Sequence, residues 1–502
     1  MMITNMDLIK AQLAYNGSVS ESDIIKHIIE EDEKSKEKEN MRMGERYYKG
    51  EHDILNHDFR QSVVYEDDTP AGINAGGTPI VNKNNSNHHN VHNFHSLLVN
   101  QKNGYIVGKA PSVTVEGADK NTELKAFEDR VTAATSDEDF SDSLSDFVVG
   151  ASNKGVEWLH PYYDIKGGPL QFAVVSAVEL RPFFDTSLQK KLTDMIRYYS
   201  ITVIVKGEEK QRKKVEWWTA KDVSYYTEND EGKFICDRRR PHWYDTTAVD
   251  GVETERAESG WGRVPFIPLF NNSIHAGDLE NIKGLQDAYN LISSASTNNQ
   301  IDLVELYWLI QGYGGETAKA IRQKLQINKA ASITDPNGKI SAEQVNLSVD
   351  ERIAWLNLLR KDIFQFGMGI DMDSESIGSA PSGVALEFRY GHLDLKADPL
   401  ISKLKKAFKE IAWYITQDIN LKNGTDYDYT LIKVDINKSI IVNEAEKVTM
   451  IEQSRGLVPD KMLLAKHPFV DDAAQAYDEL LEQKKQNMEM VVADDSANED
   501  DE

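Results

Sequence analysis

The hydrophobic pattern of the first half of the chain changes from a helical period to a strand-like one. Residues 18–49 predict one charged helix, which Ser20–Asp23 would open as a capping box. Its short apolar face consists of Ile24, Ile25, Ile28 and Ile29. From about Pro169 to Phe270, aromatic and β-branched runs such as RYYSITVIVKG, KVEWWTAKDVSYYTE and GKFICD are separated by turn residues. This alternation predicts antiparallel strands.

The helical period returns in the second half, on both sides of a small insert that reads as α/β. The first helix would take Asp278 as its N-cap, and the second would run from about Val349 to Gly367. Within the first helix, Ser293–Gln300 contains no large apolar side chain. We expect this polar band to pack on other chains or to bridge domains, because it has no core of its own to cover.

The longest predicted helix follows a loop of small residues and carries an apolar seam from Leu386 to Ile415. Pro399 lies inside this pattern and predicts a kink, because proline removes one helical hydrogen bond and clashes with the preceding turn. Shorter helices are expected over Glu444–Ser454, about Asp460–Lys466 and Asp472–Met490. The acidic, apolar-poor end of the chain predicts disorder.

Composition narrows the class of protein. The chain has 502 residues, enough for several domains, and its formal net charge of −25 disfavours tight general binding to nucleic acid. A single cysteine, Cys236, rules out an internal disulfide framework, fits a reducing compartment and suggests a structural role for that residue. No secretory signal is evident, and no apolar run approaches the roughly 18 residues of a membrane-spanning helix.

Several motifs resemble chemical sites but depart from them. His88, His92 and His95 would share a helix face and could form a metal patch, which leaves a metal-dependent enzyme as one alternative. GYIVGKA, Gly104–Ala110, has too few residues between its glycines for a P-loop and lacks the hydroxyl after lysine. Asp371, Asp373 and Glu375 have the spacing of a calcium loop but not its required glycine, so a mobile acidic loop is expected.

Two basic clusters, Lys210–Lys214 and Arg238–Trp243, stand in the strand-rich part of the chain. Solvated charges in turns explain them most simply, and a phosphate or partner site is the alternative.

Six segments, taken in order, resemble the portal proteins of tailed bacteriophages, in particular the type found in long-tailed phages of Gram-positive hosts. They are RYYKGEHDI (Arg46–Ile54), HSLLVNQKNGYIVGKAP (His95–Pro111), SNKGVEWLHPYYD (Ser152–Asp164), GWGRVPFIPLFNN (Gly260–Asn272), SGVALEF (Ser382–Phe388) and HPFVDD (His467–Asp472). In the last segment, His467 stands where the family usually has asparagine. The resemblance covers roughly residues 40–485, and it is the shared order of the segments that makes it specific.

The resemblance implies an α+β fold with a mainly helical stem and crown, a strand-containing wing and a small α/β clip. The implied parts are an N-terminal helical arm (1–39), a wing (40–277), a first stem helix (278–305), a clip (306–346), a second stem helix (347–367), a tunnel loop (368–382), a long kinked helix (383–420), a wing strand (421–442), a crown (443–490) and a disordered acidic tail (491–502).

By resemblance, the chain forms a ring of about a dozen subunits around a DNA channel at one capsid vertex of the virion. It would be a non-enzymatic protein without cofactor or metal, assembled in the host bacterial cytoplasm and active in capsid assembly, DNA packaging and ejection. Its partners would be the terminase large subunit, scaffolding and major capsid proteins, a head-completion (adaptor) protein, and double-stranded DNA passing through without sequence specificity. Another virion connector or a minor head protein is the alternative.

The resemblance also suggests functional residues. The DNA-facing tunnel loop would contain Asp371, Asp373, Glu375, Ser376, Gly378, Ser379 and Ser382. The clip surface that meets the terminase or adaptor would contain Tyr313, Glu316, Lys319, Arg322, Asp335 and Lys339. Acidic residues suit a loop that should not hold phosphate, because attraction would slow the passing DNA.

Overall fold

A computed structural model describes the chain over residues 5–14, 19–64, 78–81, 85–163, 169–205, 207–242, 244–249, 252–257, 260–302, 306–311, 339–344, 349–371, 383–439, 444–470, 473 and 476–483. The chain forms two compact units. The first contains Met1–Ile370 and Leu395–Lys438, and the second contains Asp371–Asp394 and Ser439–Glu502. Helices and antiparallel sheets occur together, which confirms the predicted α+β class.

Three helices open the first unit: α1 (Met6–Ala14), α2 (Glu21–Glu33) and α3 (Lys36–Tyr48). The single helix predicted over 18–49 is therefore wrong, because the hydroxyl of Ser35 accepts the backbone N–H of Lys38 and starts a new helix. The predicted capping box is confirmed: the Ser20 hydroxyl accepts from the Asp23 backbone, and the Asp23 carboxylate accepts from the Ser20 backbone.

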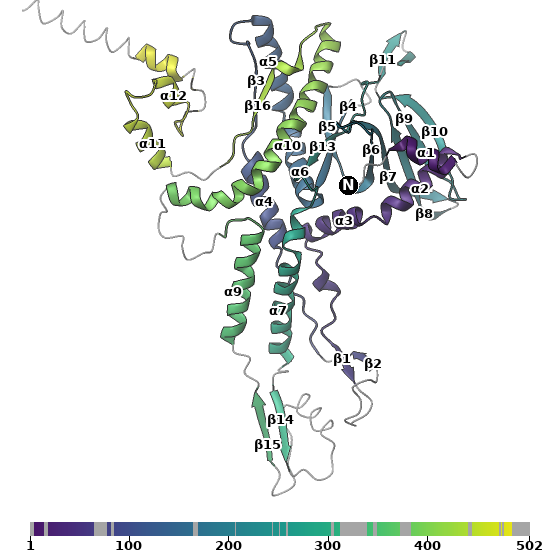
Figure 1. The fold of residues 1–502 in the computed structure, drawn as a ribbon, viewed down its shortest axis with the longest axis vertical. Coiled ribbons are helices and arrows are strands. Elements are labelled where there is room, and N and C mark those ends of the chain that lie inside the picture. Colours follow the sequence, from purple (N-terminus) through teal and green to yellow (C-terminus); the bar gives the residue numbers. More distant parts are fainter. Residues whose placement is uncertain are drawn as a thin grey trace, which may run out of the picture. The chain divides into compact units, whose positions relative to one another are not determined.

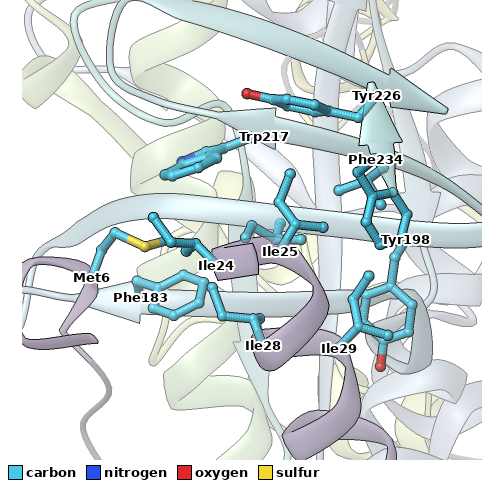
Figure 2. Packing of buried hydrophobic residues seen from close by; sticks show 12 residues of the cluster. Met6, Ile24, Ile25, Ile28, Ile29, Phe183, Tyr198, Trp217, Tyr226 and Phe234 are labelled. Atoms are coloured by element: carbon cyan, nitrogen blue, oxygen red, sulfur yellow. The ribbon is translucent and has the colours of Figure 1, made fainter. Parts of the chain in front are cut away.

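A five-stranded antiparallel sheet has the order β10-β9-β8-β7-β6 (Figure 1). Its strands are β6 (Leu180–Phe184), β7 (Leu192–Val205), β8 (Glu208–Trp218), β9 (Asp222–Glu228) and β10 (Phe234–Pro241). The strands expected from the aromatic and β-branched runs are thus confirmed. Figure 2 shows one face of this sheet, where Trp217 and Phe183 pack against the four predicted isoleucines of α2.

The opposite face of the sheet packs partly against a three-stranded sheet of order β13-β4-β5. Its strands are β4 (Val156–Tyr163), β5 (Leu170–Val175) and β13 (Ile267–Phe270). The core between the two sheets includes Trp158, Met195 and Trp218. Burial of these large side chains fixes the two sheets against each other.

Further elements of the first unit are helices, short 3-10 turns and two-stranded sheets. The helices are α4 (Phe94–Val107), α5 (Thr122–Thr135) and α6 (Glu138–Lys154), with 3-10 turns η1 (Asp53–Asn56), η3 (Ala177–Glu179), η4 (Asp278–Asn281) and η5 (Tyr429–Leu431). The strand pairs are β1 (Gln61–Val64) with β2 (Thr78–Val81), β11 (Tyr244–Val249) with β12 (Val252–Ala257), and β3 (Ser112–Val115) with β16 (Ile432–Asp435). β16 falls inside the segment expected as a wing strand.

Two neighbouring helices, α7 (Lys283–Asp302) and α9 (Val349–Phe366), are joined through the antiparallel strands β14 (Leu306–Gln311) and β15 (Lys339–Gln344), as Figure 1 shows. The prediction of two helices around an insert is confirmed. Asp278 as the N-cap is wrong, since η4 intervenes, its N-cap is Gly277, and α7 begins at Lys283. The rest of the insert, residues 312–338, lies outside the described part of the chain.

Helix α10 (Gly383–Asn423) continues through Pro399 and is the longest described helix. Its C-terminal half buries the predicted seam in the first unit, at Leu400, Leu404, Phe408, Ile411 and Ile415. The two ends of α10 belong to different units, and a kink at Pro399 stays a prediction.

In the second unit, helices α11 (Glu444–Gln453) and α12 (Asp460–Leu464) lie within the predicted helical segments. Residues 476–483 are also helical, inside the expected third helix. The acidic tail 491–502 lies outside the described residues.

Candidate functional site

Most residues of the two predicted functional surfaces lie outside the described residues. This holds for Asp373, Glu375, Ser376, Gly378, Ser379 and Ser382 of the expected tunnel loop, and for Tyr313, Glu316, Lys319, Arg322 and Asp335 of the expected clip. Two of these residues are described. Asp371 directly follows Ile370, and Lys339 is exposed as the first residue of β15. Their functional roles stay predictions.

The segment between α9 and Asp371 is held tightly by α4. The side-chain amide of Gln101 donates to the carbonyl oxygen of Ile370 at 2.7 Å, and its oxygen accepts the Ile370 N–H at 3.0 Å. A Cβ on Gly369 would collide with the Leu98 side chain, so glycine allows this close approach without moving Leu98. Met368 has a φ of 53°, which turns the chain sharply after the helix.

A buried ionic cluster lies next to this turn. Asp278 of η4 pairs with Lys102 of α4 at 3.2 Å and with Lys396 of α10 at 3.1 Å. Lys396 also donates to the carbonyl oxygen of Gly367 at 2.9 Å. Asp278 and Lys396 together therefore connect η4, α4, α10 and the residue that follows α9.

Burial controls the titration of the cluster. It lowers the pKa of Lys102 to about 8, although Asp278 favours the charged amine. Burial alone would raise the pKa of Asp278, but Lys102 and Lys396 outweigh it and hold that pKa well below its usual value. Sequence reasoning missed Lys102, yet its spacing of four from the apolar residues Leu98 and Ile106 places it on a buried helix face.

The buried face of α7 is polar and is covered by the chain's own segment 86–95. Backbone N–H groups of this segment donate to α7 side chains at 2.8–2.9 Å. The pairs are Ser86 with Asp302, His88 with Asn298, Asn90 with Ser294, His92 with Asn290, and His95 with Gln286.

These hydrogen bonds, together called the polar ladder, correct the expectation that Ser293–Gln300 packs on other chains or bridges domains. Ser294 and Asn298 are buried within the chain, so the polar band does not require another chain to cover it. The match has a geometric cause: four helical residues rise about 6 Å, close to the roughly 6.6 Å of two extended residues. Periodicity of α7 alone could not reveal the segment that satisfies it.

The predicted histidine face is wrong. His88 and His92 precede α4 in a non-helical segment, and only His95 lies in the helix. His95 is buried against the Asn153 side chain, and burial lowers its pKa to about 4. Over the described ranges, no group of three or more His, Cys, Asp or Glu residues is placed to hold a metal ion.

Helix α9 leaves apolar side chains exposed. Trp355 is 60% exposed and Leu358 is 47% exposed, and their spacing of three puts them on neighbouring positions of the helix surface. Ile353, on the same helix, is 51% exposed. Exposed apolar groups of this size on one helix are typical of an interaction surface.

The basic clusters lie on strands and not in turns, which corrects their predicted location. Lys210–Lys214 belong to β8, and Arg238–Arg240 belong to β10. Cys236 is exposed on β10, so packing does not support the structural role expected of it.

Gly104, Tyr105, Ile106 and Val107 belong to α4, so this part of the GYIVGKA segment forms no phosphate loop.

Comparison with known proteins gives one family. Residues 26–490 match the family described as phage portal protein, SPP1 Gp6-like. The portal protein of Bacillus phage SPP1 is 27% identical over 469 residues, 91% of this chain and 86% of that protein. The portal protein of Clostridium phage phiCD119 is 27% identical over 452 residues, 88% and 91% of the two chains. No helix in the described ranges is long and apolar enough to cross a membrane. The chain therefore belongs to the SPP1 Gp6-like family of phage portal proteins.

Proposed function

We propose that this chain assembles into a ring of about a dozen identical subunits around a DNA channel at one capsid vertex. The observation that carries the proposal is the exposed apolar surface of α9 in a chain that belongs to the portal family. Covering Trp355 and Leu358 with a neighbouring copy would remove apolar surface from water at about 25 cal/mol per Å². Because the polar face of α7 is satisfied internally, α9 is the better candidate for the contact between subunits.

In such a ring, α7 and α9 form the stem, and the segment that contains β14 and β15 forms the clip. The clip is the proposed docking surface for the terminase large subunit during packaging and for a head-completion protein afterwards. The segment after Ile370 serves as the tunnel loop, whose acidic residues keep DNA from adhering to the channel wall. Scaffolding and major capsid proteins would meet the ring during head assembly. The protein itself acts structurally, and ATP hydrolysis belongs to the terminase.

Native mass spectrometry and negative-stain electron microscopy of the purified protein test the proposal. We expect a closed ring with a central hole for the wild type. Trp355→Asp combined with Leu358→Asp should yield subunits that no longer close into rings, because charge in an apolar contact is costly. Asn357→Asp adds a charge at an exposed position of the same helix that does not face Trp355 or Leu358, so it is the matched control and should still form rings. If both variants still form rings, α9 does not form the contact between subunits. A wild type that never forms rings would favour the alternative of a minor head protein.

A further inference from the structure

One face of the five-stranded sheet ends in a pocket that the channel function leaves unexplained. The pocket has a volume of about 410 Å³ and is bounded by the sheet and by β4, β5 and the segment around Trp261. Aromatic rings form much of its wall, including Trp218, Tyr225 and Phe266. Tyr162 lines it as well and is 37% exposed. Its size and aromatic lining with a few polar groups are typical of a binding site.

Charged groups enter the pocket at defined positions. Arg197 pairs with Glu179 at 3.0 Å and approaches Glu216 at 3.4 Å. Arg240 donates to the hydroxyl of Tyr225 at 2.9 Å and lies over its ring. The pocket thus combines two guanidinium groups and one carboxylate with a surrounding set of aromatic rings.

The strand register extends the basic character beyond the pocket. Side chains alternate between the two sheet faces, so residues paired across strands share one face. Tyr225 pairs with Arg238 on one side and with Glu216 on the other, and Glu216 pairs with Arg197. By the same alternation, Lys214 and Arg212 of β8 share this face. Three of the four basic residues of the first cluster (Lys210, Arg212 and Lys214) and two of the three arginines of the second (Arg238 and Arg240) therefore lie on the pocket face, opposite the face that α2 covers.

Charge indicates what this surface would bind. The chain carries a net charge of −25, and a concentration of arginine and lysine on one sheet face stands out against that background. Basic side chains recognise carboxylates by charge-assisted hydrogen bonds, and aromatic pockets take large apolar side chains. Duplex DNA fits less well, because a pocket of about 410 Å³ admits one side chain and the acidic remainder of the chain repels phosphates.

We propose that this pocket and its basic rim bind an acidic peptide segment of another protein, with one aromatic side chain inserted beside Trp218 and carboxylates held by Arg238 and Arg240. The inference concerns a partner site on the sheet and goes beyond the channel function. It does not depend on ring formation, and the two are tested by separate measurements.

Fluorescence polarisation with the full-length protein tests it. The probe is a labelled synthetic peptide with one tryptophan flanked on both sides by glutamates. One control peptide replaces tryptophan by serine, and the other replaces the glutamates by glutamines. We expect the probe to bind at least about ten-fold more tightly than either control peptide, because each lacks one of the two contacts.

Variants locate the binding. Ala173 lines the pocket. Ala173→Phe should fill the pocket and lower the affinity for the probe about ten-fold, while leaving the arginines in place. Arg240→Glu should lower the affinity for the probe at least as much, because it reverses the charge that holds a carboxylate. Lys233→Glu, the same charge change on an exposed residue, should leave affinity unchanged. Unfolding curves that match the wild type establish that the variants fold.

Three results would overturn the proposal. They are equal affinity for the probe and both control peptides, probe binding that neither Ala173→Phe nor Arg240→Glu weakens, and preferential binding of a labelled random-sequence DNA duplex by the wild type but not by Arg240→Glu. The last result would assign the basic rim to nucleic acid instead.

Discussion

Gln101 and Ile370 are joined by two hydrogen bonds, in which one side-chain amide satisfies both the N–H and the carbonyl of a single residue. The next residue, Asp371, begins the second compact unit. Helix α4 therefore fixes the last residue of the first unit before the chain enters the proposed tunnel loop. We therefore expect residues 367–370 to stay in place against α4.

Replacing Gln101 by leucine should release this fixed point. Both hydrogen bonds are lost and the Ile370 N–H is left without its partner, at a cost of about 1–3 kcal/mol in the free energy of unfolding. Hydrogen exchange measured by mass spectrometry should become faster at residues 367–370. Gln365→Leu, an exposed position on α9, is the control. Unchanged hydrogen exchange in the Gln101 variant would show that the two Gln101 hydrogen bonds do not hold residues 367–370 in place.

Gly369→Ala should destabilise the first unit because the new methyl group meets Leu98. Overpacking of this kind costs about 1–3 kcal/mol. Leu98→Ala alone leaves a cavity, which lowers the free energy of unfolding by about 2–5 kcal/mol. The double variant should lose less stability than the sum of the two single losses, since each change relieves the other. Additive losses in urea unfolding would contradict the close approach.

Asn298→Ala should remove one pair of hydrogen bonds between α7 and residues 86–95. Asn298 accepts the N–H of His88 at 2.8 Å and donates to its carbonyl oxygen at 2.9 Å, and both groups lose their partner. We expect a loss of about 2–3 kcal/mol in the free energy of unfolding. Faster hydrogen exchange should appear in residues 86–92. Gln300→Ala on the exposed side of α7 should change stability by less than about 0.5 kcal/mol.

Lys102 should make stability depend on alkaline pH. Its pKa falls from 10.5 in the unfolded chain to about 8 in the folded one, so between these values the unfolded state binds more protons. The contribution of Lys102 to the free energy of unfolding therefore rises with pH through this window, by at most about 1.4 kcal/mol per pH unit. Below pH 8 both states are protonated and the contribution is constant.

Urea unfolding of the wild type and of Lys102→Met at pH 7.5, 8.5 and 9.5 isolates this effect. The wild type should gain stability relative to the variant as the pH rises. Lys125→Met, at a lysine whose side chain is 55% exposed, should show no such trend. A difference between wild type and Lys102→Met that stays constant with pH would mean that Lys102 keeps an ordinary pKa in the folded protein.

The sequence determined the elements whose signals are local. The capping box at Ser20, the isoleucine face of α2, the strands around Trp217 and the helices around the insert all follow from periodicity and short-range hydrogen bonding. Six ordered segments were also enough to indicate the portal family, since their order reflects the whole chain and not a single motif.

Only the tertiary structure decided which polar groups pair across long distances. Asp278 looks like a helix cap along the chain, but it lies between Lys102 and Lys396, far away in sequence. Residues 86–95 carry no pattern that shows them covering α7. A buried polar group requires a partner, and a hydrogen bond can be closed by any segment that the fold brings near. The sequence therefore predicts which side chains need satisfying, while the packed structure selects the groups that satisfy them.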